Sequence, residues 1–269
     1  MALRTLTLKD LTIDDERSFR HVGIYETLKD VLLRDAVSFR VPEAGSRAAT
    51  WDRVVFLNLT FWGTNEPADV LADEHIPADV VAHVAWHHLA RKALGPSSST
   101  ADGLFLGESI ASAFDLYLVG RLLGHSPNAE FLETQVPALA AAAEAAGLPS
   151  RHFEALLGTI VEDPERAFED LRELLFDATT SLVGASGVDD AVERLGQFDG
   201  HRFSPLLHHY EISNWVLYAR AYAARGLEPD PRVRQIDTQL RSAGGTPLVG
   251  LEWLEKNWIQ AVAQSQERV

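Results

Sequence analysis

The sequence of 269 residues contains no cysteine at all. The absence of cysteine excludes disulfide bonds, thiolate nucleophiles, and zinc or iron–sulfur sites held by cysteine. Any metal ion bound by this chain would therefore need histidine and carboxylate ligands.

Basic residues and long apolar runs are also scarce. The chain has 24 Lys and Arg against 39 Asp and Glu, a net charge of −15, and no Lys/Arg-rich run of the kind that binds phosphates. No window approaches the roughly 20 apolar residues that span a bilayer. The N-terminus alternates polar and apolar residues and lacks the continuous apolar stretch of a signal peptide. We expect a soluble, cytoplasmic protein with no nucleic-acid or membrane partner.

Helical patterns dominate the sequence, and its 46% of hydrophobic residues is enough to bury a substantial core. Two segments rich in β-branched and aromatic residues, 36–41 and 53–62, predict two strands of a small sheet. Apolar periodicity and turn residues predict helices over 14–35, from Ala78 to the loop at 95–103, and over 106–124, 128–147, 150–161, 163–184, 188–197, 204–226 and 246–266.

These elements predict a mainly α (α+β) fold, a helical protein with a small N-terminal β element. A boundary near Gly124 to Pro127 would divide an α+β portion, residues 1–126, from a helical portion, residues 127–269. No linker is long enough to require independent domains, so one compact unit with two lobes is expected.

The chemistry is concentrated in the segment "VVAHVAWHHLARKALG", residues 80–95. Residues four apart on a helix share a face, so His83 and His87 can offer imidazole nitrogens to one ion. The next predicted helix carries Glu108 in "GESIASAFD", with 20 residues between His87 and Glu108 for a loop and a turn back. Two antiparallel helices would then close a site of two histidines and one glutamate, with a fourth position left for water.

The two motifs "HVAWH" and "GESIASAFD" resemble those of the gluzincin metallopeptidases, of which the thermolysin family is the familiar member. In that superfamily the first motif is His-Glu-x-x-His and the glutamate of a second helix is the third zinc ligand. The resemblance covers residues 79–124 and implies a zincin-like helix pair in which His83, His87 and Glu108 bind Zn²⁺.

Two positions depart from the gluzincin pattern. Val84 stands where the family has the glutamate that takes a proton from the metal-bound water, and Ser112 stands where many members have an aspartate that orients a ligand histidine; the nearest carboxylate beyond it is Asp115. Loss of a general base costs about 10²- to 10⁴-fold in rate, but leaves Lewis acidity at the metal intact. The pattern predicts a pseudoenzyme that holds a metal without ordinary peptidase activity and serves in binding or regulation.

A second polar cluster, "LLHHYEISNW", occupies residues 206–215. By analogy with the metallopeptidases, His208, His209 or Tyr210 can stabilise an oxyanion at the metal, and Glu211 can replace the missing base. Against this interpretation, histidine and tyrosine are common at the rim of a core. Trp215, Tyr218 and Tyr222 follow at helical spacing and predict a packing stripe rather than a ligand cage.

Two other functions remain open at the level of sequence. Two histidines and a carboxylate are also the ligands of non-haem iron(II) oxygenases, and a hydrolase can recruit Glu211 or His88 as its base, so Fe²⁺ and an altered mechanism are alternatives. A metal-free helical interaction protein is the third possibility, with Glu108 as a helix N-terminal carboxylate and Asp79 as a cap, although Asp79 also suits a fourth ligand. The partner is an unidentified protein or small molecule. No nucleotide-binding motif is present.

Overall fold

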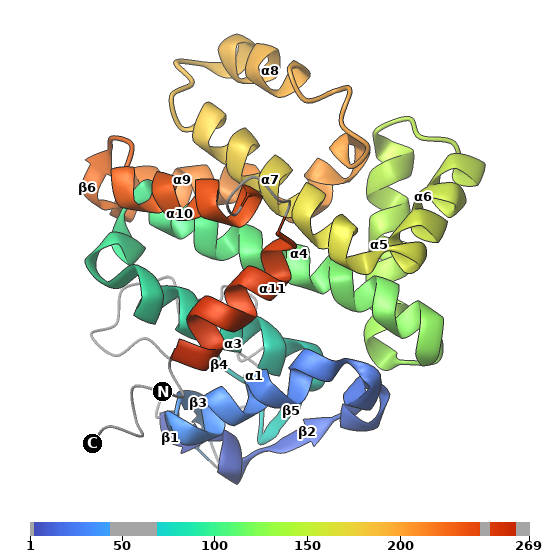
Figure 1. Ribbon diagram of the computed structural model, residues 1–269, viewed down its shortest axis with the longest axis vertical. Helices are drawn as coiled ribbons and strands as arrows, with labels where there is room; N and C mark the ends of the chain where they lie inside the picture. Colours follow the sequence, from blue (N-terminus) through green and yellow to red (C-terminus); the bar gives the residue numbers. More distant parts are fainter. Residues whose placement is uncertain (1–2, 44–68, 243–247, 262–269) are drawn as a thin grey trace. The chain divides into compact units, whose positions relative to one another are not determined.

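The computed structural model describes residues 3–43, 69–242 and 248–261 (Figure 1). Over these residues the protein is mainly helical with a few short N-terminal strands, which confirms the predicted fold class. The chain divides into two compact units, residues 1–85 and 86–269, so the division falls inside helix α3 (Ala78–Leu94) and not near residue 126. The reason is that α4 (Ala101–His125) packs against later helices and so belongs with the C-terminal part.

The first unit contains the strands. The predicted strand at 36–41 is confirmed as β3 (Ser38–Pro42), whereas the predicted strand at 53–62 lies outside the described residues. Among the described residues, β3 pairs antiparallel with β1 (Leu3–Thr7) and parallel with β4 (Asp69–Val70), and β2 (Thr12–Asp14) pairs parallel with β5 (His75–Pro77).

The predicted helix at 14–35 is divided in two. Residues Glu16–His21 form a 3-10 helix, and α1 (Gly23–Arg34) follows it. Val22, between them, has an extended backbone conformation (φ −90°, ψ 92°), which prevents one continuous helix. The apolar residues of α1 recur at helical spacing and are buried, among them Leu28, Val31 and Leu32.

Helix α4 is the core helix of the second unit. It lies along α7 (Pro164–Leu182) (Figure 1). It also contacts α5 (Glu130–Ala145), α6 (Ser150–Glu162), α9 (Ile212–Tyr222) and α10 (Pro231–Arg241). It begins at Ala101 rather than at the predicted 106, because the Thr100 side chain accepts a hydrogen bond from the Gly103 N–H (3.2 Å) and caps the helix. A Cβ at Gly103 would lie 1.9 Å from the Ser97 carbonyl oxygen, so this close approach requires glycine.

Within the described residues, α4 is also the one helix long and apolar enough to cross a membrane. Of its apolar 18-residue window, 83% is buried inside the protein, as is common for the core helix of a soluble fold. The structure therefore gives no multiple-span pattern in the described part of the chain.

Most of the remaining predicted helices are confirmed. The predicted helix at 128–147 is α5, which contains Pro137 in its interior. The helices are α5 (Glu130–Ala145), α6 (Ser150–Glu162), α7, α8 (Val188–Gly196) and, within the predicted 246–266, α11 (Gly250–Leu254) with a π-helical turn at Glu255–Ile259.

The prediction of one continuous helix over 204–226 is wrong, because this range contains three separate elements. A 3-10 helix, η6 (Ser204–Tyr210), ends at Glu211, and α9 (Ile212–Tyr222) and the short strand β6 (Ala224–Leu227) follow. Glu211 has φ 48° and ψ 39°, the left-handed conformation, which an α-helix cannot contain. Its side chain accepts a hydrogen bond from the Asn214 amide (2.7 Å), so it belongs to the turn that starts α9.

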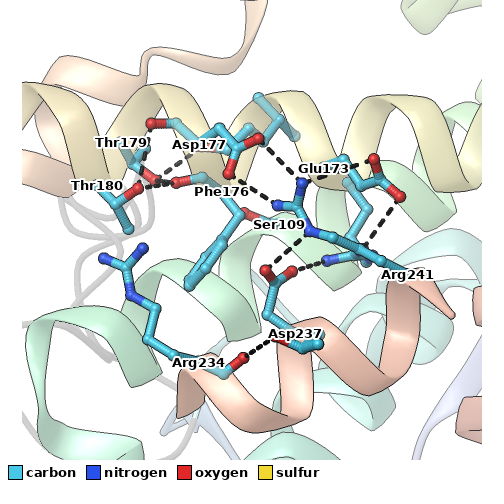
Figure 2. Close-up of polar contacts among 12 residues, drawn as sticks. Ser109, Glu173, Phe176, Asp177, Thr179, Thr180, Arg234, Asp237 and Arg241 are labelled. Carbon is cyan, nitrogen blue, oxygen red and sulfur yellow. Dashed lines mark hydrogen bonds and ion pairs between the residues drawn. The ribbon is translucent and has the colours of Figure 1, made fainter. Parts of the chain in front are cut away.

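Helix α10 (Pro231–Arg241) was not expected from periodicity, although the Asp-Pro pair at its start is a helix-start signal. Charged side chains join it to α7 (Figure 2). The fully buried Arg172 donates to Asp237 (2.7 Å), and Arg241 donates to both Asp237 (2.9 Å) and Asp177 (2.7 Å). These ion pairs offset part of the free-energy cost of burying the charged side chains.

Candidate metal centre

Helix α3 places the two histidines of the HVAWH motif one turn apart. The helix is unbroken from Ala78 to Leu94, so its own geometry puts His83 and His87 on one face. Both side chains are half-buried, whereas Val84 and Trp86 between them are buried. The histidines therefore lie on the open side of a helix whose other side is core.

Helix α4 supplies the carboxylate. Glu108 is half-buried and is surrounded along the helix by buried residues, including Leu106, Ser109 and Ile110. Its Oε2 lies 3.6 Å from His87 Nε2, with 15% of the glutamate side chain and 29% of the histidine side chain exposed. The sequence prediction that the second helix turns back to face the first is met at this contact.

Ligand atoms of His83, His87 and Glu108 all lie within 4.8 Å of one another. Nitrogen and oxygen ligands at zinc distances in a tetrahedral site are about 3.3–3.5 Å apart, close to the His87–Glu108 separation. From separations of at most 4.8 Å, side-chain shifts of up to about 1.5 Å bring all three ligand atoms to that tetrahedral spacing. The donor set, two imidazoles and a carboxylate, also suits zinc.

The positions that depart from the gluzincin pattern are both buried. Val84 is 8% exposed and Ser112, one turn beyond Glu108, is 7% exposed. Neither residue can supply a carboxylate. Asp79 lies in the first turn of α3, where its negative charge is one of several that raise the pKa of Tyr25, after the larger effect of burial.

Tyr218 of α9 lies near enough to Glu108 for the two to interact electrostatically, which the sequence did not indicate. Burial raises the pKa of its phenol, and the nearby Tyr222 and the charge of Glu108 raise it further. Tyr218 is therefore within electrostatic reach of Glu108 and stays protonated at neutral pH. No local pattern marks this proximity, since α9 meets α4 only in the tertiary structure.

The downstream cluster is spread over several environments. His209 and Tyr210 line a cavity together with Asp115, and none of the three candidate ligands lines that cavity. Asp115 is seven residues beyond Glu108, which is about 10 Å along an α-helix. Burial lowers the pKa of the His209 imidazole, and the negative charge of Asp115 partly opposes that effect.

His208 and Glu211 are exposed, and Glu211 is engaged with Asn214. The roles that the sequence suggested for His208, Tyr210 and Glu211 at a metal therefore stay predictions.

The chain was also compared with known proteins. No family model matches it, and no curated protein or solved structure matches it. The gluzincin resemblance stays a prediction that depends on the two motifs of α3 and α4.

Proposed function

We propose that the protein binds a divalent metal ion, Zn²⁺ in the first place, through His83, His87 and Glu108, and that it lacks ordinary peptidase activity. The observation that carries the proposal is the meeting of three ligand atoms from α3 and α4 within 4.8 Å. A cytoplasmic location and a role in binding or regulation, with a protein or small-molecule partner, belong to the same proposal.

The position of Glu108 within α4 argues against a merely structural role. A carboxylate near a helix N-terminus is favoured by the macrodipole, but that effect fades within the first turn. Helix α4 begins at Ala101, so Glu108 lies about two turns into it and does not gain this stabilisation. A half-buried carboxylate beside two imidazoles is instead the arrangement that a cation stabilises.

Val84 separates metal binding from peptide hydrolysis. When bound, zinc supplies Lewis acidity. The chain's own residues hold the ion, and Tyr218, whose phenol stays protonated near Glu108, can donate a hydrogen bond to an anionic ligand. The buried valine cannot accept a proton from water. Position 84 therefore offers no base for the removal of a proton from the metal-bound water, the step for which gluzincins use glutamate.

Metal analysis tests the proposal directly. Protein expressed in metal-replete medium should contain close to one zinc ion per chain, and His83→Ala and His87→Ala should each lower zinc affinity by about 100-fold or more. His88→Ala is the matched control, because His88 is adjacent to His87 but points about 100° away around α3. Sub-stoichiometric metal in the unaltered protein, or equal affinity in all three variants, would refute the proposal. Bound iron with oxygen-dependent turnover would favour the oxygenase alternative.

The missing base can be tested separately with Val84→Glu. Because the proton acceptor is the missing catalytic group in this proposal, the variant should keep its zinc and gain measurable hydrolysis of an unstructured peptide substrate. Burial of a carboxylate at this position should also lower stability by several kcal/mol. Robust zinc-dependent hydrolysis by the unaltered protein would contradict the assignment of an inactive centre.

A further inference from the structure

Helix α8 exposes its apolar side chains to solvent, and none of its residues is buried. Val188 is 80% exposed and Val192 64% exposed, the two highest values for large apolar side chains among the described residues. Leu195, one turn further, is half-buried. At 100° per residue these three positions lie within about 60° of one another around the helix, so they form one apolar stripe.

Polar contacts join the opposite side of α8 to the end of α7. Asp190 and Arg194 lie about 160–200° around the helix from Val192. Arg194 donates hydrogen bonds to Asp190 (2.6 Å) and to the Ser181 carbonyl oxygen of α7 (3.1 Å), and the Ser186 N–H donates to Asp190 (2.9 Å). These hydrogen bonds, with that from Arg194 the strongest, lower the pKa of Asp190 to about 2, so its pair with Arg194 stays ionised.

This orientation is the reverse of the usual one. An amphipathic surface helix turns its apolar side toward the core and its charged side toward water. In α8 the ion pair is on the side that contacts α7, and the valines are on the exposed side. Figure 1 shows α8 at the edge of the second unit, beyond the end of α7. An exposed apolar stripe of this kind is typical of a surface that binds a partner.

The charges beside the stripe indicate which partner fits. Asp189 and Glu193 are exposed, and each follows one of the valines by one residue, so both lie on the same flank of the stripe. The whole chain has a net charge of −15. A second copy of α8 would add like charges along the contact, and an anionic membrane surface would be repelled, whereas a cationic partner would be attracted.

We propose that the apolar stripe of α8 binds an amphipathic helix of another protein, one with an apolar face and a lysine- or arginine-rich flank. The valines would pack on the apolar face, and Asp189 and Glu193 would face the cations of the flank. Because α8 has nine residues, the contact is small, and we expect weak, reversible binding. The proposal does not depend on metal binding, since α8 contains none of the three candidate ligands.

Three synthetic peptides test the chemistry of the partner on the unaltered chain. The first is an alanine-based helix of about 18 residues, long enough to be helical, with leucines at i, i+4 and i+7 and lysines beside them. The second has the same composition in scrambled order, and the third has glutamate in place of lysine. Fluorescence anisotropy at low salt should show saturable, micromolar binding of the first peptide and at least tenfold weaker binding of the other two.

The apolar part of the contact is tested with the double variant Val188→Ser/Val192→Ser. We expect it to bind the amphipathic lysine peptide about tenfold or more weakly than the unaltered chain. Val161→Ser is the matched control, because Val161 is an exposed valine of a different helix, α6, and its replacement should leave binding unchanged. Both valines of the stripe are exposed, so the double variant should fold normally.

The charged flank is tested with Asp189→Asn/Glu193→Gln. This variant should weaken binding of the amphipathic lysine peptide about fivefold or more. Its control, Glu154→Gln/Glu162→Gln, removes the same net charge from exposed positions of α6 and should have a smaller effect. The comparison separates a contact at α8 from the general attraction of a cation to an acidic protein.

Four outcomes would overturn the proposal: no saturable binding of the amphipathic lysine peptide below about 1 mM, equal binding of the scrambled peptide, unchanged binding in the valine double variant, or equal losses in the two charge variants. A dimer of the unaltered chain in sedimentation velocity that the valine double variant abolishes would assign the stripe to self-association instead. Adsorption to phosphatidylcholine vesicles that the same variant abolishes would assign it to a membrane surface. Failure of zinc binding would leave these results unaffected.

Discussion

Helix α4 carries carboxylates in two contrasting settings. At its start, Asp102 is 2% exposed and accepts hydrogen bonds from Arg234 (2.7 and 3.0 Å) and from the Asp230 backbone N–H (2.9 Å). About two turns later, Glu108 faces the imidazole of His87 across 3.6 Å. The guanidinium of Arg234 pairs with Asp102 and fixes that carboxylate within the fold. The imidazoles beside Glu108 leave its carboxylate able to bind a cation together with them. The neighbours supplied by other helices decide which role a carboxylate on α4 takes.

The largest effect should come from Glu108→Gln. The amide keeps the size of the side chain but is a poor zinc ligand, so we expect zinc affinity to fall by about 100-fold or more, with little change in the stability of the metal-free protein. Competition with a chromogenic chelator measures the affinity. An unchanged zinc affinity would remove the distinction between the two carboxylates.

Asp102→Asn should do the reverse. We expect it to lower the free energy of unfolding by about 1.5–3 kcal/mol, because it weakens charge-assisted hydrogen bonds at a buried position, and to leave zinc affinity unchanged. Urea denaturation measures the loss. Arg234→Gln is the matched partner, and the double variant should lose less than the sum of the two single variants if the pair is coupled. Strictly additive losses of stability would argue against coupling between Asp102 and Arg234.

The smallest effect concerns His209 in the cavity. Because burial lowers its folded-state pKa, the unfolded chain binds more protons as the pH falls below about 6.5, and this residue makes stability decrease toward acid. His209→Asn should therefore flatten the loss of stability between pH 7.5 and 5.5, by less than the equivalent of one proton. Urea titrations at the two pH values measure it, with the exposed His152→Asn as control. An equal slope in both variants would contradict the buried, neutral assignment.

Local sequence determined much of the helical framework. Apolar periodicity and caps identified α3, α5, α6, α7 and α8 with bounds close to the observed ones, because these signals act within a few residues. The spacing of His83 and His87 fixed their common face for the same reason. The break at Glu211 was missed, since a left-handed residue in an otherwise helical pattern has no strong local mark when it is not glycine.

The meeting of groups from different helices was decided by tertiary structure alone. Packing of the apolar faces of α4, α7 and α9 sets which polar positions come together, and that depends on the whole core rather than on any local pattern. This packing put Tyr218 near Glu108 and placed His209 and Tyr210 around Asp115. The sequence by itself determined that the chain has a pair of histidines with ligand spacing, and long-range packing decided that Glu108 faces them.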